Sequence, residues 1–368
     1  MTQRRPLRIA VVGATGLVGR TMIQVLAERG HGVENLTLLA SGRSAGSEVT
    51  TDQGVRLTVH EAVPAAFDAV DVALFSAGAS VSRALAPEAV ARGATVIDNS
   101  SAWRMEPGVP LVVQQVNAGD LEAHEGIIAN PNCSTMQLAP ILMALRDAVG
   151  LERVIVDTYQ AVAGTGAEAI AELEGQLAAH VAGTPKLASV YPHAIAFNAL
   201  PEIDVFREDG YTQEEWKVIA ESRKILHLPE LAISCTAVRV PVFVGHSEAV
   251  HVETGETLTP EAARRLFATV PGVVVRDDPR AHAYPLATDA AGTDDILVGR
   301  IRRDASLPPG RGLALWIVAD NLRVGAATNA VQVAEILAER GWLAPRSRRG
   351  TPGAAPAFRG ALSETVAT

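Results

Sequence analysis

Cysteine and aromatic residues are scarce in this chain. Its 368 residues include two cysteines, Cys133 and Cys235, and 4% aromatic residues. Two thiols are too few for a disulfide framework in a chain of this size, so we expect a reducing compartment, the cytoplasm. The nine histidines lack the spacing to cysteines or carboxylates that is typical of metal ligands. No metal site is therefore predicted.

Long apolar runs and blocks of basic residues are also missing. No apolar run approaches the roughly 18–20 residues of a membrane span, and no apolar signal region precedes Leu7. The net charge is −9, and no basic block interrupts the part of the chain that is expected to fold. We therefore expect neither a nucleic acid nor a membrane as partner, but a small-molecule substrate. The length is sufficient for two domains.

The segment Asn130–Gln137 carries a candidate nucleophile. Asn132 is a good N-cap residue and an apolar periodicity begins at Met136, so Cys133 is predicted in the first turn of a helix. The positive end of the helix dipole should favour the thiolate there. Pro140 predicts a kink or a very short first turn. The alternative is that Cys133 is a buried apolar residue without chemistry.

A glycine-rich stretch near the N-terminus predicts a dinucleotide site. Leu7–Val12 is an apolar run typical of a buried parallel strand, and Gly13–Gly19 follows it with the spacing G-x-x-G-x-x-G. A helical pattern then begins. A strand, a glycine turn and a helix in this order let the backbone approach a pyrophosphate at the helix N-terminus. The alternative is a glycine turn that binds nothing.

The next predicted strand indicates which dinucleotide is bound. Leu36–Ala40 is apolar, and an NAD-binding protein normally carries Asp or Glu near the end of this strand. This chain has Ser41-Gly42-Arg43-Ser44 instead. An arginine and two hydroxyls suit a 2′-phosphate, so the predicted cofactor is NADP, with a plain surface turn as the alternative.

Two more strand-like runs end in small or polar residues. Val70–Phe75 leads to Ser76-Ala77-Gly78, and Ala94–Asp98 leads to Asn99. Ligands of open parallel sheets lie at the carboxyl ends of the strands, so these residues are candidates for the wall of the cofactor site. A last short strand, Ile127–Ala129, leads to Asn130.

The later part of the chain carries further candidates. Val154–Val162 reads as a strand, and Ala167–Ala182 and Glu214–Leu226 read as helices. Glu221 and Lys224 lie three residues apart on the second helix, where a solvated ion pair is the simpler interpretation.

Arg239 and His246 are separated by an odd number of residues, so a straight strand would point them to opposite faces. A break at Pro241 and Gly245 would bring both to one site.

Taken together and in order, several segments closely resemble aspartate-β-semialdehyde dehydrogenase, a likeness that runs from about Leu7 to Trp342. The segments are Gly13–Gly19, Ser41–Ser44, Asp98–Met105, Asn130–Gln137, Thr158–Gly166, Ile195–Asn198, Arg239–His246 and Asp320–Ala326. The resemblance implies an α/β fold with a Rossmann-type parallel-sheet nucleotide domain and an α+β catalytic and dimerisation domain. It places the NADP-binding domain at 1–130, completed by 321–343, and the catalytic domain at 131–320 of a homodimer. From composition, 344–368 is a predicted disordered tail.

The same resemblance implies the reaction. L-aspartyl-4-phosphate would be reduced by NADPH to L-aspartate-4-semialdehyde and inorganic phosphate, reversibly, in the biosynthesis of lysine, methionine and threonine. Cys133 would form a thioester, His246 would be a general acid/base with a pKa near neutral, and Gln160 would position the acyl group.

Further roles follow for substrate and cofactor. Arg239 would bind the α-carboxylate and Glu221 the α-ammonium. The phosphate would be held by Arg104, Asn132 and Lys224. The cofactor-binding residues would be Gly13, Thr15, Gly16, Leu17, Val18, Gly19, Ser41, Arg43, Ser44, Ser76, Ala77, Gly78, Asn99, Gly164 and Asn321.

One departure and two rival functions remain. Gln114-Gln115 stands where the family has Pro-Glu, which concerns packing or dimer contacts more than chemistry.

The nearest rival is N-acetyl-γ-glutamyl-phosphate reductase, whose substrate nitrogen carries no charge for Glu221 to bind. The other is an NADP-binding regulatory protein without turnover, against which the presence of both Cys133 and His246 argues. Cys235 is interpreted as structural.

Overall fold

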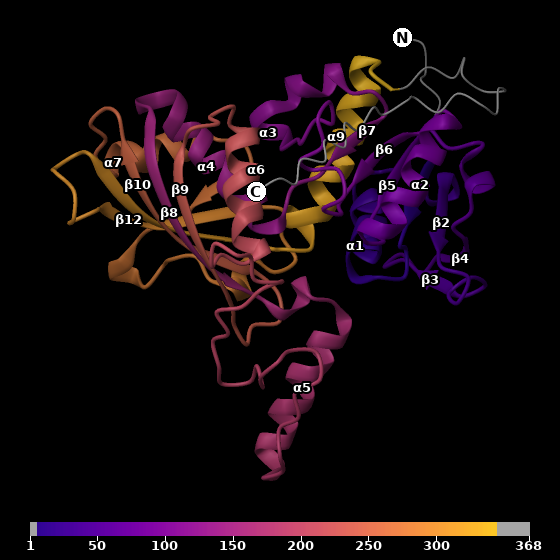
Figure 1. Ribbon diagram of the computed structural model, residues 1–368, viewed down its shortest axis with the longest axis horizontal. Coiled ribbons are helices and arrows are strands. Elements are labelled where there is room, and N and C mark those ends of the chain that lie inside the picture. Colours follow the sequence, from indigo (N-terminus) through magenta and orange to yellow (C-terminus); the bar gives the residue numbers. More distant parts are fainter. Residues whose placement is uncertain (1–5, 344–368) are drawn as a thin grey trace, which may run out of the picture.

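Two β-sheets form the body of the molecule. The computed structural model describes residues 6–343, and the two sheets lie on either side of helix α9 (Thr328–Arg340) (Figure 1). The first sheet is parallel apart from one edge strand and the second is mixed, which confirms the expected α/β fold class. The domain limits remain predictions, and the predicted tail at 344–368 lies outside the described residues.

The first sheet has seven strands in the order β3-β4-β2-β1-β5-β6-β7. Their bounds are β1 (Ile9–Val12), β2 (Leu36–Ala40), β3 (Glu48–Thr50), β4 (Arg56–Glu61), β5 (Val72–Phe75), β6 (Thr95–Asp98) and β7 (Ile127–Ala129). β1, β5 and β6 are buried along their whole length, as expected of parallel strands that are covered on both faces. The sequence pattern did not predict the edge strand β3 and its neighbour β4, because most residues of both strands are exposed.

Helices from both ends of the chain cover this sheet. α1 (Leu17–Glu28) and α9 pack together with β1 in one apolar cluster that includes Ile9, Met22 and Val331. The remaining helices here are α2 (Ala79–Ala91) and the short α3 (Gln114–Asn117). Thus the last described helix belongs to the core built by the first strands.

The second sheet has six strands in the order β11-β12-β13-β10-β8-β9. Their bounds are β8 (Leu151–Gln160), β9 (Ala232–Arg239), β10 (His246–Thr254), β11 (Val273–Val275), β12 (Ile296–Arg303) and β13 (Gly312–Ala319). Helices α4 (Cys133–Val149) and α6 (Gln213–Ile225) pack on it, and their apolar side chains join a common core with Val154 and Val250.

The other helices of the second half are more peripheral. They are α5 (Ala167–Ala182), α7 (Pro260–Phe267) and α8 (Ala287–Ala290). α5 has the bounds expected from the sequence, and it projects away from both sheets (Figure 1). No helix in residues 6–343 is both long enough and apolar enough to cross a membrane.

Candidate active site

A cleft of about 460 Å³ lies between the two halves of the molecule. One wall comes from the ends of the first-sheet strands and the other from α4, α6 and the second sheet. Its lining includes Val18, Ser76, Gly78, Asn99, Arg104, Asn132, Cys133, Gln160, Gly164, Arg239, His246 and Asn321, all of them predicted site residues. Sequence reasoning therefore found much of this cleft.

Cys133 is the first residue of α4, as predicted. The side-chain oxygen of Asn132 caps this helix by accepting a hydrogen bond from the Ser134 backbone N–H at 2.9 Å. The helix continues past Pro140 to Val149, so the expected short first turn is wrong. Only one intrahelical hydrogen bond is lost at a proline, and the buried apolar residues of α4 hold the rest.

The ionisation of Cys133 differs from the expectation. Burial first and the carboxylate of Glu214 second raise the pKa of its thiol to about 12, against the opposing effects of Arg239 and Arg104. The helix dipole does not overcome this desolvation in the free protein. Cys133 is therefore a neutral thiol in the free protein, and positive charge near its sulfur, as from Arg239 and Arg104, favours the thiolate.

Three neighbouring strands bring together the polar side chains of the second sheet. Gln160 on β8 pairs in register with Arg239 on β9, and β10 begins at His246 on the other side of β8. All three side chains are buried. The predicted break between Arg239 and His246 is confirmed, because β9 ends at the first and β10 begins at the second. This break allows residues an odd number apart to face one cleft.

His246 is held in a defined protonation state. Its Nδ1 accepts a hydrogen bond from the Ala161 backbone N–H at 3.0 Å, which leaves the ring proton on Nε2. Burial lowers the pKa of His246 to about 3, with Arg239 contributing in the same direction. The expected near-neutral pKa is therefore wrong for the free protein. The neutral ring presents Nε2–H as a hydrogen-bond donor.

Gln160 and Arg239 are both anchored by protein groups. Gln160 Nε2 donates to Ser134 Oγ at 2.6 Å and to Glu214 Oε1 at 3.0 Å. Arg239 Nη1 donates to the Ala161 carbonyl at 2.8 Å, while its buried Nε has no hydrogen-bond partner within the described residues. Arg239 therefore retains donors for a ligand in the cleft.

Arg104 supplies positive charge from the first half of the chain. Its Nε donates to the Asn130 carbonyl at 3.0 Å, Nη2 to the Asn99 carbonyl at 2.7 Å and Nη1 to Glu221 Oε1 at 3.0 Å. The side chain is nearly buried but still lines the cleft.

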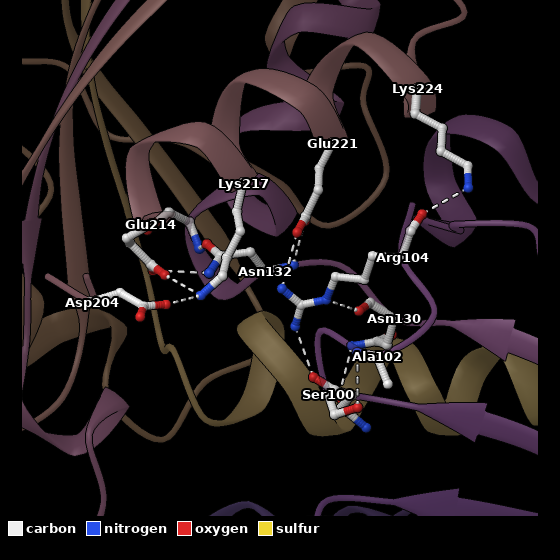
Figure 2. A network of polar contacts seen from close by, with 12 residues as sticks. Ser100, Ala102, Arg104, Asn130, Asn132, Asp204, Glu214, Lys217, Glu221 and Lys224 are labelled. Carbon is white, nitrogen blue, oxygen red and sulfur yellow. Dashed lines mark hydrogen bonds and ion pairs between the residues drawn. The ribbon is translucent and has the colours of Figure 1, made fainter. Parts of the chain in front are cut away.

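The structure corrects the predicted roles of Glu221 and Lys224. Neither residue is part of the cleft lining. Glu221 is 1% exposed and both of its oxygens are bonded, one to Arg104 and the other to the Asn132 backbone N–H at 2.6 Å. Lys224 Nζ donates to the carbonyls of Arg104 and Val109 at 2.7 and 2.9 Å, away from the cleft (Figure 2). Because neither residue lines the cleft and both are bonded to protein groups behind it, neither is available to a substrate.

Glu214 and Lys217 occupy the cleft in their place. Lys217 Nζ bonds Asp204 at 2.7 Å and Glu214 at 3.1 Å, and all three residues line the cleft (Figure 2). Asn132 Nδ2 donates to Glu214 at 2.8 Å. Burial alone would raise the pKa of Glu214, but Lys217 and the hydrogen bonds from Gln160 and Asn132 lower it to about 2. Glu214 is therefore ionised at neutral pH.

The missed pair has the same spacing as the predicted one. Glu214 and Lys217 are three residues apart, as are Glu221 and Lys224, and the two pairs begin seven residues apart. Seven residues are nearly two helical turns, so both pairs lie on one face of α6 but about 10.5 Å apart along its axis. The repeated pattern was visible in the sequence, but only the position of α6 decides which pair reaches the cleft.

The glycine turn has the geometry of a dinucleotide site. Gly13 has φ +88°, and a Cβ there would lie 2.3 Å from the Ser76 carbonyl oxygen, so only glycine fits. α1 begins after Gly16 without a side-chain cap or an acidic residue in its first turn, which leaves its N–H groups for an anion. Thr15, Leu17, Gly19 and Ala77 belong to this turn, to α1 or to the loop after β5.

The predicted 2′-phosphate residues lie beside this turn but outside the cleft lining. Ser41, Arg43 and Ser44 form a turn directly after β2, and β2 is the parallel neighbour of β1. The N–H groups of Gly13 and Ala14 both donate to the Leu39 carbonyl near the end of β2. Arg43 is exposed there. The arrangement fits an adenosine ribose that extends from the glycine turn.

Asn321 and a π-helical turn close the cleft behind the thiol. Asn321 Oδ1 accepts from the Gly245 backbone N–H at 2.9 Å, whereas its buried Nδ2 has no partner within residues 6–343. In the turn Arg323–Ala327, a Cβ on Gly325 would lie 2.8 Å from the Cβ of Cys133. The unpaired amide fits the predicted role of Asn321 as a cofactor-binding residue. Gly325 was not predicted, because its closeness to Cys133 is a tertiary contact.

No group of three or more His, Cys, Asp or Glu side chains within residues 6–343 is arranged to hold a metal ion.

Two family models match the chain. "Semialdehyde dehydrogenase, NAD binding domain" matches residues 8–124, and "Semialdehyde dehydrogenase, dimerisation domain" matches residues 142–324. The two matches agree with the division into two sheets.

Curated relatives and solved structures carry one name. The aspartate-semialdehyde dehydrogenase of Aquifex aeolicus is 52% identical over 339 residues, which cover 91% of this chain and 98% of the relative. That of Bacillus subtilis is 51% identical over 341 residues, which cover 90% and 98%. The crystal structure of aspartate semialdehyde dehydrogenase II from Vibrio cholerae has a TM-score of 0.87 at 43% identity, with 91% of this chain and 99% of that chain covered. The chain therefore belongs to the aspartate-semialdehyde dehydrogenase family of oxidoreductases.

Proposed function

We propose that this protein interconverts L-aspartate-4-semialdehyde plus inorganic phosphate with L-aspartyl-4-phosphate, with NADP as the redox partner. The observation that carries the proposal is a single cleft lined by Cys133, His246, the charged side chains of α6 and Arg239, and the residues beside the glycine turn. Another Vibrio cholerae structure with the same similarity is described as complexed with ASA, which agrees with a small aldehyde as substrate.

The covalent steps proceed through Cys133. In the oxidative direction its sulfur adds to the aldehyde carbon, and the thiol proton ends on the carbonyl oxygen. The Nε2–H of His246 supports the developing charge on that oxygen. A nicotinamide held beside Asn321 would supply the hydride acceptor for the same carbon. Loss of the hydroxyl proton to solvent leaves the thioester. A phosphate oxygen then displaces the Cys133 sulfur, which takes a proton from solvent again, to give the acyl phosphate.

The charged side chains divide between the two ends of the substrate. Arg239 binds the α-carboxylate with its remaining donors, and Glu214 binds the α-ammonium. Arg104, Asn132 and Lys217 bind the phosphate. Gln160, which is bonded to Ser134 and Glu214, orients the acyl carbon. Each buried charge then meets an opposite charge on the substrate, which offsets its desolvation cost.

The decisive assay measures phosphate-dependent NADPH formation with L-aspartate semialdehyde, run beside N-acetyl-glutamate semialdehyde. We expect turnover with the first only, because Glu214 offers a full negative charge to a free ammonium. Cys133→Ala should abolish turnover and retain NADPH binding. Preference for the acetylated substrate would favour the rival reductase, and substantial activity of Cys133→Ala would refute the thioester.

The choice of NADP has its own test. Arg43→Asp removes the cation beside the predicted 2′-phosphate and introduces repulsion, so the KM for NADP should rise at least tenfold while that for NAD falls. An unchanged preference would show that the 2′-phosphate lies elsewhere.

The proposed assembly is a homodimer. The second sheet matches the dimerisation model, and Tyr159 and Trp316 form a partly exposed aromatic pair on its outer face, with ring centroids 5.4 Å apart. We expect an apolar face of this kind to be covered by a second copy. Light scattering gives the molar mass that tests this. The two unpaired thiols are consistent with the proposed cytoplasmic location.

A further inference from the structure

Glu221 is a buried charge that the proposed reaction does not use. It is 1% exposed, yet it contacts two groups that line the cleft, the guanidinium of Arg104 and the backbone of Asn132. Asn132 directly precedes the nucleophile, and Arg104 lies in the loop after β6. One carboxylate of α6 thus joins the nucleophile to a loop of the first sheet.

The hydrogen bonds of Arg104 show what this contact achieves. A guanidinium has five N–H donors in a fixed plane. Three bonds engage them here, to Asn130, Asn99 and Glu221, and the residue still lines the cleft. Two donors remain for an anion. The plane in which they lie is set by the three protein acceptors, of which only Glu221 carries a charge.

Lys224 holds the same residue at its backbone. Its ammonium donates to the carbonyls of Arg104 and Val109, with a longer contact to that of Glu106 at 3.4 Å. Figure 2 shows Glu221 at the guanidinium of Arg104 and Lys224 at its carbonyl. Two residues of α6 that lie about one turn apart therefore hold Arg104, one at its guanidinium and the other at its backbone carbonyl.

We propose that Glu221 and Lys224 are positioning residues that aim the two remaining donors of Arg104 at the phosphate and fix the backbone that precedes Cys133. The inference rests on the proposed function, because it assumes that Arg104 binds phosphate. Without Glu221, the guanidinium has a free edge and can rotate out of the plane that suits the anion. Without Lys224, the loop carrying Arg104 loses its internal support.

The experiment measures phosphate binding without requiring turnover. Cys133 is alkylated with iodoacetamide at pH 9 in increasing concentrations of inorganic phosphate, and the half-protecting concentration is determined. The variant is Glu221→Gln, which keeps the shape and removes the charge. The matched control is Glu215→Gln, because Glu215 is also a buried glutamate of α6 and accepts from the backbone N–H groups of Thr212 and Ala237.

We expect Glu221→Gln to raise the half-protecting phosphate concentration at least tenfold, since charged hydrogen bonds of arginine are strong. The KM for phosphate should rise equally, with the KM for the semialdehyde changed less than threefold. Lys224→Met should give a smaller rise, about threefold to tenfold. Glu215→Gln should leave the half-protecting phosphate concentration and the KM for phosphate within twofold of their values in the unsubstituted protein.

Three results would overturn the proposal. They are an unchanged half-protecting concentration in folded Glu221→Gln, an equal rise in Glu215→Gln, or no protection of the parent protein by phosphate. If Glu221→Gln does not fold, the half-protecting phosphate concentration of Lys224→Met is compared with that of Glu215→Gln instead. Failure of the proposed function would appear separately, as protection by phosphate in a protein that does not turn over aspartate semialdehyde.

Discussion

The two ends of helix α6 carry the same pair of residue types and have different surroundings. The N-terminal pair, Glu214 and Lys217, lines the cleft and contacts Asp204. The C-terminal pair, Glu221 and Lys224, is bonded to the side chain and backbone of Arg104. Residue type and spacing are identical in the two pairs. What differs is the set of groups that each pair meets.

Helix α6 contributes charged side chains to the site in two different ways. A charge that lines the cleft can contact a ligand even though it is also paired within the protein, so its removal should act on binding of the group that it contacts. A charge that faces a protein loop is already paired, so its removal acts through the residue that it holds. Removal of a charge from either pair is therefore expected to affect the reaction. The effects should differ in size and in the substrate whose KM changes.

The largest effect is expected for Lys217→Met. Lys217 is the cation of α6 that lines the cleft, so its loss should lower kcat/KM for phosphate about 100-fold or more, or about 3 kcal/mol. Steady-state kinetics with varied phosphate measure this. Lys217→Arg, which keeps the charge, should recover part of the loss. An equal loss in Lys224→Met would remove the distinction between the two ends of the helix.

Substitution of the two glutamates, Glu214 and Glu221, is expected to change the KM for different substrates. Glu214→Gln should raise the KM for aspartate semialdehyde about tenfold or more, since a hydrogen bond between two charges contributes roughly 1.5–3 kcal/mol. Its KM for phosphate should change less than threefold, the reverse of the pattern expected for Glu221→Gln. The same substrate affected in both variants would contradict the separate roles.

A gain in phosphate affinity is expected for Asp204→Asn. Asp204 lines the cleft, bonds Lys217 and is partly exposed, with φ +69°. Its carboxylate competes with phosphate for the ammonium of Lys217. Because an exposed ion pair is weak, the KM for phosphate should fall only about twofold to fivefold, or about 0.5–1 kcal/mol. A raised KM would show that Asp204 supports the site.

The smallest effect concerns the thiol itself. Burial is the main cause of the raised pKa of Cys133, and the Glu214 carboxylate adds to it. A negative charge disfavours the thiolate, so Glu214→Gln should lower this pKa and shift the pH dependence of Cys133 alkylation to lower pH. Glu221→Gln should leave the profile in place. A shift in the opposite direction would contradict the electrostatic account of the thiol.

Local patterns predicted most of the elements around the site. Asn132 indicated the start of α4, the apolar run before Gly13 indicated β1, and the alanine-rich stretch Ala167–Ala182 indicated α5. Each is a signal of a few neighbouring residues. The hairpin β3–β4 carries no such signal, because Val49 and Val59 are its only fully buried residues and β4 also depends on pairing with β2.

The protonation states of Cys133 and His246 could not be predicted from local sequence patterns. Cys133 at a helix start and His246 as a catalytic base were both expected to have pKa values suited to neutral pH. In the folded chain, burial raises the first pKa to about 12 and lowers the second to about 3. Desolvation depends on everything packed around a group, and the sequence near the residue does not contain that information.

The sequence by itself determined which chemistry the chain carries: a thiol at a helix start, a glycine turn for a dinucleotide, and an arginine and a histidine on either side of a strand break. Only the tertiary structure decided which charges line the cleft, since the placement of α6 in the fold puts Lys217 in the cleft lining and Lys224 at the backbone carbonyl of Arg104. The physical reason is that helical periodicity specifies the face of a residue but not its neighbours across the fold.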